Sequence, residues 1–227
     1  MCGRIASNIT GVEQILELYG LRLLQLDFTP RYNVAPGQDV LAVIQPPAQE
    51  RQAVYLRWGL LPPWAKDPAI AYKLINARAE TAAEKPAFRD AWRRRRCIIP
   101  VSGFYEWQRS PERKAKIPYY IRLRAGHIMS LAGLWEVRRE EDDSLTCTCT
   151  ILTTEANSLV APIHNRMPVL LPPGAFDLWL NHDSYDPQLI KSLMQPYPAE
   201  EMEAYRVSTI VNSAANDVPE CLLPWNG

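Results

Sequence analysis

Short apolar stretches alternate with polar turns along the whole chain. Where apolar and polar residues alternate, or where β-branched and aromatic residues gather, the pattern predicts strands. Where apolar residues recur every three or four positions, as at Val12, Ile15 and Tyr19, it predicts a helix. The predicted strands cover residues 40–44, 53–58, 97–100, 103–108, 119–123, 128–135, 146–153 and 205–211, and the predicted helices cover 11–19, 84–94, 156–163, 175–180 and 187–194.

Many short strands with interspersed helices are typical of an α+β fold. The 20 prolines are spread along the 227 residues, which disfavours long uninterrupted helices. No internal repeat or low-complexity linker divides the sequence. We therefore predict a single domain, residues 1–227, built on a curved, mainly antiparallel, barrel-like β-sheet with flanking short helices. The polar segments 108–117 and 138–144 are expected to be surface hairpin loops.

Composition and charge narrow the class of protein. Apolar residues make up 47% of the chain, no stretch reaches the roughly 20 apolar residues of a membrane helix, and the N-terminus lacks a signal pattern. We expect a soluble, cytoplasmic protein without a membrane partner. The net charge is zero, but residues 1–100 hold 14 Lys+Arg against 9 Asp+Glu (+5), and residues 101–227 hold 11 against 16 (−5). This asymmetry is compatible with a basic DNA-binding face and does not by itself indicate one.

The five cysteines do not form a disulfide pattern, because their number is odd and no CxxC pair occurs. A reducing compartment is therefore expected. Cys147 and Cys149 are two positions apart in a predicted strand and face the same side. A metal site would need two further ligands at suitable spacing, so this pair is interpreted as core packing and no metal is predicted.

The second residue, Cys2, combines two nucleophiles if Met1 is removed. Its α-amine would have a pKa of about 7.7–8.0 and its thiol one of about 8.5. The amine can attack an aldehyde to give a Schiff base, and the thiol can then close a five-membered thiazolidine ring on the imine carbon. The alternative is that Cys2 belongs to a frayed terminus without chemistry.

Two further candidates could move protons. Glu106 lies among aromatic residues in Phe104-Tyr105-Glu106-Trp107, where a carboxylate is either paired or has a raised pKa. Both conditions suit proton transfer. Alternatively, Glu106 could form a purely structural ion pair with an arginine. His164 is one of three histidines, and it could instead cap the predicted helix that precedes it.

Two other segments have a polar or aromatic character that suits binding. An extended chain at 76–80 would point Asn76, Arg78 and Glu80 to one side, as the polar face of an edge strand also would. Trp64 stands between Pro63 and Ala65 and is expected to project, either as a lid on the core or as a platform for stacking a base.

Taken together, these segments resemble the SOS-response-associated peptidase (SRAP) family of abasic-site-processing proteins. The resemblance extends from Cys2 to about Glu220, with no departure at the reactive positions, and rests on the order of its motifs. These are Cys2-Gly3-Arg4, Tyr32-Asn33-Val34-Ala35-Pro36, Trp58-Gly59-Leu60, Asn76-Ala77-Arg78-Ala79-Glu80, Cys97-Ile98-Ile99-Pro100, Gly103-Phe104-Tyr105-Glu106-Trp107, Ala132-Gly133-Leu134-Trp135 and His164-x-Arg166-Met167-Pro168, followed by Asn212 and Asp217-Val218-Pro219-Glu220.

The resemblance implies a sensor of abasic sites that forms a slowly self-reversing crosslink with single-stranded DNA, near 3′ ends or junctions with duplex. It implies that Cys2 is the nucleophile, that Asn76 orients it or the opened sugar, and that Glu106 and His164 transfer protons. DNA contacts are implied for Arg4, Asn33, Pro36, Trp64, Arg78 and Arg166. No cofactor is expected, because an aldehyde is already electrophilic. A monomer that joins the nucleoid when bound to DNA is expected.

Two other activities fit the same residues. A Cys2/His164 dyad could act as a cysteine peptidase, which needs only the thiol. A non-catalytic reader could bind single-stranded or modified DNA through Trp64 and the arginines, with a steep salt dependence and no covalent product.

Overall fold

The computed structural model describes residues 2–22, 28–109, 116–182 and 186–225. The named elements are β1 (Ile5–Ser7), α1 (Val12–Tyr19), β2 (Arg31–Val34), β3 (Asp39–Ile44), β4 (Gln52–Trp58), η1 (Pro68–Lys73), β5 (Asn76–Arg78), α2 (Ala79–Ala82), α3 (Arg89–Arg94), β6 (Arg96–Val101), β7 (Gly103–Gln108), β8 (Ile117–Leu123), β9 (Met129–Arg139), β10 (Leu145–Glu155), β11 (Arg166–Pro168), η2 (Pro173–Ala175), α4 (Phe176–Leu180), α5 (Pro187–Ser192), η3 (Ala199–Glu201), β12 (Met202–Arg206), η4 (Thr209–Asn212) and η5 (Pro219–Leu222).

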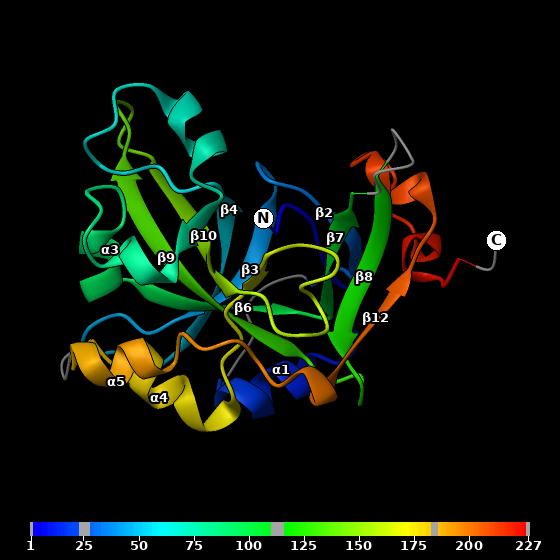
Figure 1. The fold of residues 1–227 in the computed structure, drawn as a ribbon. Coiled ribbons are helices and arrows are strands. Elements are labelled where there is room, and N and C mark those ends of the chain that lie inside the picture. The colour runs from blue at the N-terminus through cyan, green and yellow to red at the C-terminus, as the bar shows by residue number, and fades with distance from the viewer. Residues whose placement is uncertain (1, 23–27, 110–115, 183–185, 226–227) are drawn as a thin grey trace.

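The strands form two curved sheets (Figure 1). One has five strands in the order β12-β8-β7-β1-β2. The other has seven strands. Six of them follow the order β11-β10-β4-β3-β6-β9, and the seventh, β5, pairs with β10. Because β9 also pairs with β10, the strands β10, β4, β3, β6 and β9 close a ring. Among the named pairs, β4 and β5 run parallel to their neighbour β10, and the others are antiparallel. The predicted α+β fold on a curved, mainly antiparallel, barrel-like sheet is confirmed.

Strand β3 is apolar on both faces because each face packs into a different core cluster. Leu41 and Val43 join the cluster shared with α1, α4 and α5, the helices along the lower edge of Figure 1. Val40 and Ala42 point the other way, into a cluster between the two sheets. The second cluster also contains Cys2, the second residue of the chain.

Most predicted elements occur close to their expected ranges. The helix at 11–19 and the strands from 40–44 to 146–153 correspond to α1, β3, β4 and β6–β10. The loop at 138–144 is a hairpin turn, in which the Glu140 amide donates a hydrogen bond to the Ser144 carbonyl at 2.9 Å. The loop at 108–117 joins the paired strands β7 and β8, and its residues 110–115 lie outside the described residues.

Two predicted helices differ in the structure. Residues 158–163 form turns instead of a helix, because Pro162 has no amide hydrogen to donate to the carbonyl four residues earlier. The predicted helix at 84–94 begins only at Arg89. The residues around Pro86 form turns, one of which is closed by the Phe88 amide, which donates to the Lys85 carbonyl at 2.9 Å.

Two predicted extended segments also differ in the structure. The last strand, predicted at 205–211, runs instead from Met202 to Arg206, and the Ser208 hydroxyl accepts from the Ile210 amide where η4 begins. The segment 76–80 is extended only as far as Arg78, and Glu80 lies in α2.

No helix in the described ranges combines the length and the apolar character needed to cross a membrane.

Candidate functional site

Cys2 is fully buried, in the cluster between the two sheets. The side-chain amide of Asn76 donates to the Cys2 carbonyl at 2.7 Å, and the Tyr105 amide donates to the Arg4 carbonyl at 2.9 Å. Immediately afterwards Ile5 pairs with both β2 and β7. The alternative of a frayed terminus is therefore wrong for Cys2.

Its surroundings make the Cys2 thiol a weak acid. Burial is the main cause that raises its pKa above the usual value, and the negative charge of Glu106 is the second. The sulfur lies 4.0 Å from the Arg4 carbonyl. At neutral pH the thiol consequently keeps its proton, so its sulfur is a neutral group held in an apolar layer.

Glu106 and His164 face each other at the edge of this layer. Glu106 is buried on β7, and its Oε1 lies 4.0 Å from Nδ1 of His164. The two side chains line a cleft of about 660 Å³ together with Gly3, the residue that follows Cys2. The fold thus brings the predicted proton-transfer residues next to Cys2, from segments that are far apart in the sequence.

Two backbone groups of Arg166 lie beside Nδ1 of His164. The Arg166 amide donates to Nδ1 at 3.0 Å, and the Arg166 carbonyl lies 3.3 Å from the same nitrogen. The shorter contact, from the amide, favours a neutral ring that carries its proton on Nε2. The ring is partly exposed, at 26% of its side-chain surface, so that Nε2 is the nitrogen able to give a proton to a substrate.

Three of the predicted DNA contacts are engaged inside the protein. The Arg4 guanidinium donates to Oδ1 of Asn33 and to the Val211 carbonyl, both at 2.7 Å, and lies over the Trp107 ring. Arg166 forms a bidentate ion pair with Glu80.

Asn33 requires a correction to its predicted role. Its side chain has no exposed surface, because its amide group donates to the carbonyls of Val211, Ser213 and Asn216. It is therefore not available to DNA in this structure, and it holds the C-terminal segment against β2.

The other predicted DNA contacts lie at the surface. Arg78 is exposed at the end of β5 and Pro36 is partly exposed in the turn before β3. Trp64 has 56% of its surface exposed, as its position between prolines and polar residues predicted. It lies in the connection between β4 and β5, which begins at Gly59. The φ of +131° at Gly59 favours glycine, and a Cβ added there would lie 2.8 Å from the Ala71 carbonyl oxygen.

Two basic residues that line the cleft are not among the residues predicted for the site. Arg109 and Lys116, at the two ends of the β7–β8 connection, are exposed beside Glu106 and His164. From the sequence they belong only to a surface loop, since a lone basic residue in a polar loop has no distinguishing pattern. Their position over the cleft depends on the hairpin that brings them together.

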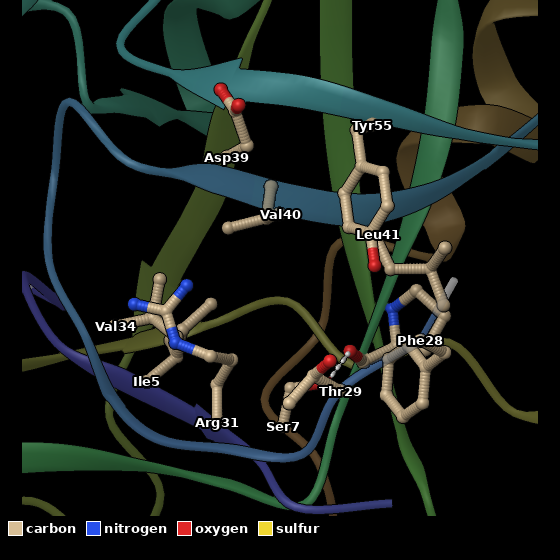
Figure 2. Close-up of a pocket in the computed structure, with 11 residues that line it drawn as sticks. Ile5, Ser7, Phe28, Thr29, Arg31, Val34, Asp39, Val40, Leu41 and Tyr55 are labelled. Carbon is tan, nitrogen blue, oxygen red and sulfur yellow. Dashed lines mark hydrogen bonds between the residues drawn. The ribbon is translucent and has the colours of Figure 1, made fainter. Parts of the chain in front are cut away.

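A separate hollow of about 340 Å³ lies between β1–β2 and β3–β4 (Figure 2). Asp39 and Tyr55 lie across it from Ser7 and Arg31. Arg31 is paired with Asp217, so its charge is engaged by the C-terminal segment. The residues lining this hollow include none of the predicted catalytic residues.

Within the described ranges, no group of three or more His, Cys, Asp or Glu residues is placed to hold a metal ion. Cys149 is buried in the cluster between the sheets and Cys147 packs against that cluster, as the strand pattern predicted.

Comparison with known proteins places this fold and site in a family. A family model described as SOS response associated peptidase (SRAP) matches residues 1–214. The chain belongs to this family. It is 45% identical over 224 residues to the abasic site processing protein YoqW of Bacillus subtilis (strain 168), covering 98% of this chain and 99% of that protein. It is 29% identical to the abasic site processing protein HMCES of Gallus gallus, covering 99% of this chain and 78% of that protein.

Solved structures agree with this assignment. A crystal structure of a protein from Bacteroides thetaiotaomicron superposes with a TM-score of 0.86 at 27% identity, covering 99% of this chain and all of that chain. One from Bordetella bronchiseptica has a TM-score of 0.76 at 26% identity and covers 91% of this chain and all of that chain.

Proposed function

We propose that the protein captures abasic sites in single-stranded DNA as a covalent thiazolidine between Cys2 and the ring-opened deoxyribose. The observation that carries the proposal is the convergence of Asn76, Glu106 and His164 on the segment that bears Cys2. Relatives that align along nearly the whole chain are named abasic site processing proteins, which supports the same substrate class here.

Removal of Met1 frees the amine of Cys2 and starts the chemistry. The unprotonated amine adds to the sugar aldehyde, and loss of one water gives a Schiff base. The Cys2 sulfur then adds to the imine carbon, its proton passes to the nitrogen, and the five-membered ring closes. Aldehyde and aminothiol thus give thiazolidine and water, without an oxidant or a reductant. Because its pKa is raised, the thiol follows the amine.

Glu106 and His164 supply the proton transfers. Glu106 takes a proton from the attacking amine and returns it when water leaves, and the same transfers in reverse release the crosslink slowly. His164 gives its Nε2 proton to the sugar ring oxygen, which favours the open aldehyde. Asn76 holds the Cys2 carbonyl and thereby the direction of the amine.

DNA contacts are assigned to the exposed side chains around the site. Trp64 stacks on a base, Arg78 binds a flanking phosphate, and Pro36 lies beside them at the surface. Arg109 and Lys116 add two positive charges at the cleft. A single protein chain engages the DNA near a 3′ end or a junction with duplex.

The two alternative activities are less well supported. A Cys2/His164 peptidase needs a thiolate, and burial raises the pKa of this thiol instead of lowering it. A DNA-binding protein that forms no covalent product would not need a buried carboxylate that faces a histidine next to Cys2.

The decisive experiment compares abasic and intact oligonucleotides on a denaturing gel, using the wild type, a variant with residues inserted between Met1 and Cys2, and Cys2→Ser. The wild type should give a heat-stable crosslink with abasic DNA only. The insertion keeps the thiol but leaves the amine acylated, so its crosslink should disappear. Cys2→Ser keeps the amine and should give only a Schiff base that borohydride can trap.

The outcome also separates the alternatives. A peptidase would keep its activity on peptides after the insertion, and a reader would bind both oligonucleotides without a covalent product. A heat-stable crosslink that persists in the insertion variant would contradict the proposal.

A further inference from the structure

Two cations stand opposite each other where the β7–β8 hairpin opens. Strands β7 and β8 pair antiparallel as far as Gln108 and Ile117 (Figure 1). Arg109 and Lys116 are the next residues on the two sides, and both are exposed and line the cleft. Like charges that face each other across antiparallel strands destabilise the pairing. An anion bound between the two side chains would remove this cost.

The described part of the protein does not supply that anion. None of the ion pairs between described residues involves Arg109 or Lys116. Glu106 is the carboxylate that lines the same cleft, but it is buried and faces His164, with Oε1 at 4.0 Å from Nδ1. The two positive charges are thus available to an anion in the cleft, and a phosphate offers them several acceptor oxygens.

The same cleft extends to the reacting residue. Gly3, which follows Cys2, lines it, and Glu106 is close enough to Cys2 for its negative charge to raise the pKa of the thiol. From Glu106 to Arg109 the chain advances three residues, or roughly 10 Å when extended. An open five-carbon aldehyde with a phosphate at its far end spans most of this distance, and the long side chains of Arg109 and Lys116 can cover the rest.

We propose that Arg109 and Lys116 form a phosphate subsite, through which Cys2 also captures free aldehyde sugars that carry a phosphate. This chemistry rests on the proposed function, because it uses the same amine and thiol. The aldehyde oxygen leaves as water, and the aldehyde carbon gains one bond to nitrogen and one to sulfur, so no oxidant or reductant is required. An abasic nucleotide and a free sugar phosphate share the aldehyde and the phosphate, and the free sugar should therefore compete with abasic DNA.

Two sugars test the subsite. The phosphorylated probe is 2-deoxyribose 5-phosphate, and the neutral probe is 2-deoxyribose. Intact-protein mass spectrometry follows the adduct, which has the mass of protein plus sugar minus one water. Each rate is divided by the rate at which free cysteine captures the same sugar, because the 5-phosphate prevents closure of a six-membered ring and so changes the fraction of open aldehyde.

Three proteins are compared, all with Met1 removed. They are the wild type, the double variant Arg109→Ser with Lys116→Ser, and the control Arg93→Ser with Arg94→Ser, which removes two exposed charges from α3. Crosslinking to abasic DNA is measured in the same preparations.

The normalised rate of the wild type should be at least roughly tenfold higher for the phosphorylated sugar, about the factor that one charge-assisted hydrogen bond contributes. The double variant at Arg109 and Lys116 should lose this preference and keep its rate with the neutral sugar, whereas the α3 control should behave as the wild type. Inorganic phosphate should slow only the reaction of the phosphorylated sugar. The preference should shrink as salt is raised, because exposed charges are screened.

Equal normalised rates for the two sugars in the wild type would contradict the subsite. So would a double variant that keeps the preference, or one that reacts more slowly with both sugars to the same extent. Wild-type protein that crosslinks abasic DNA without preferring the phosphorylated sugar retains the proposed function and lacks the subsite. Protein that gives no adduct with abasic DNA or with either sugar contradicts the proposed function itself.

Discussion

The Cys2 thiol lies in an apolar layer between two sheets. This position affects which of the two Cys2 nucleophiles reacts first in the proposed reaction. Burial and the nearby Glu106 carboxylate raise the pKa of the thiol, so the sulfur remains protonated at neutral pH. The reference pKa of an α-amine, about 7.7–8.0, is already below that of a thiol. In the proposed reaction the amine is consequently the first nucleophile, and the thiol adds to the imine carbon afterwards, as its proton passes to the imine nitrogen.

Asn76 is the residue whose substitution should best separate positioning from binding. Asn76→Asp replaces the donor at 2.7 Å from the Cys2 carbonyl with a second acceptor, which repels it. The single-turnover crosslinking rate should fall at least roughly tenfold, because the reacting amine loses its alignment. The Kd of DNA, measured by fluorescence anisotropy, should change little. A variant with the wild-type rate would show that the Asn76 contact does not direct the nucleophile.

At the scale of elements, the predictable part of the fold is the part with regular patterns. The apolar runs of β3 and β9 and the run of β-branched and apolar residues in β10 were sufficient to place these strands. The three- or four-residue strands β1, β2 and β11 were missed as strands, because so few residues show no period. These short strands nevertheless carry the site, since β1 follows Cys2 and β11 begins at Arg166.

The candidate site was predictable as a set of residue types and not as a set of contacts. Glu106 and His164 could be selected because a carboxylate among aromatics and a rare histidine are unusual. The engagement of Arg166 by Glu80, or of Arg4 by Asn33, depends on strands brought together from distant segments. An arginine that holds a loop and one that binds a phosphate look the same in a sequence.

The β7–β8 hairpin should contribute DNA affinity without base preference. Arg109→Ser with Lys116→Ser removes two exposed charges at the cleft, and each phosphate contact to a single strand contributes roughly 0.7 to the slope of log K against log salt. The slope should therefore decrease by about 1.4. Arg93→Ser with Arg94→Ser, which removes two exposed charges from α3, is the control and should leave the slope unchanged. Equal slopes for the two double variants would contradict a role for the hairpin.

At the scale of the whole molecule, the C-terminal segment is hydrogen-bonded to the region around Cys2. Residues from Val211 to Asp217 accept hydrogen bonds from Arg4, Asn33 and Arg31, and Trp107 donates to Asn212 at 2.7 Å. These contacts join residues 211–217 to Arg4, β2 and β7. Arg4, two residues after Cys2, is thereby held by a residue 207 positions away.

Asp217 is the central acceptor of this segment, and its contribution should depend on pH. It accepts from the Arg31 guanidinium and from the amides of Tyr32 (2.6 Å) and Asn33 (2.9 Å). Burial acts to raise the pKa of Asp217, but the hydrogen bonds from Arg31 and the amides outweigh it and leave the pKa below its usual value. The unfolded chain therefore binds a proton here more readily than the folded one, so the carboxylate stabilises the fold above a pH of about 4 and loses this effect as the pH falls further.

Asp217→Ala should accordingly lower the free energy of unfolding by about 2 kcal/mol at neutral pH, which corresponds to a Tm lower by about 4–8 °C for a chain of this length. Glu220→Ala removes the same charge from an exposed position in the same segment and should change the Tm by much less. Thermal unfolding between neutral pH and about pH 3 measures both. The difference between wild type and Asp217→Ala should narrow as the pH falls, because the wild-type carboxylate becomes protonated. A difference that stays constant across this range would mean that packing, and not the charged acceptor, holds the C-terminal segment against β2.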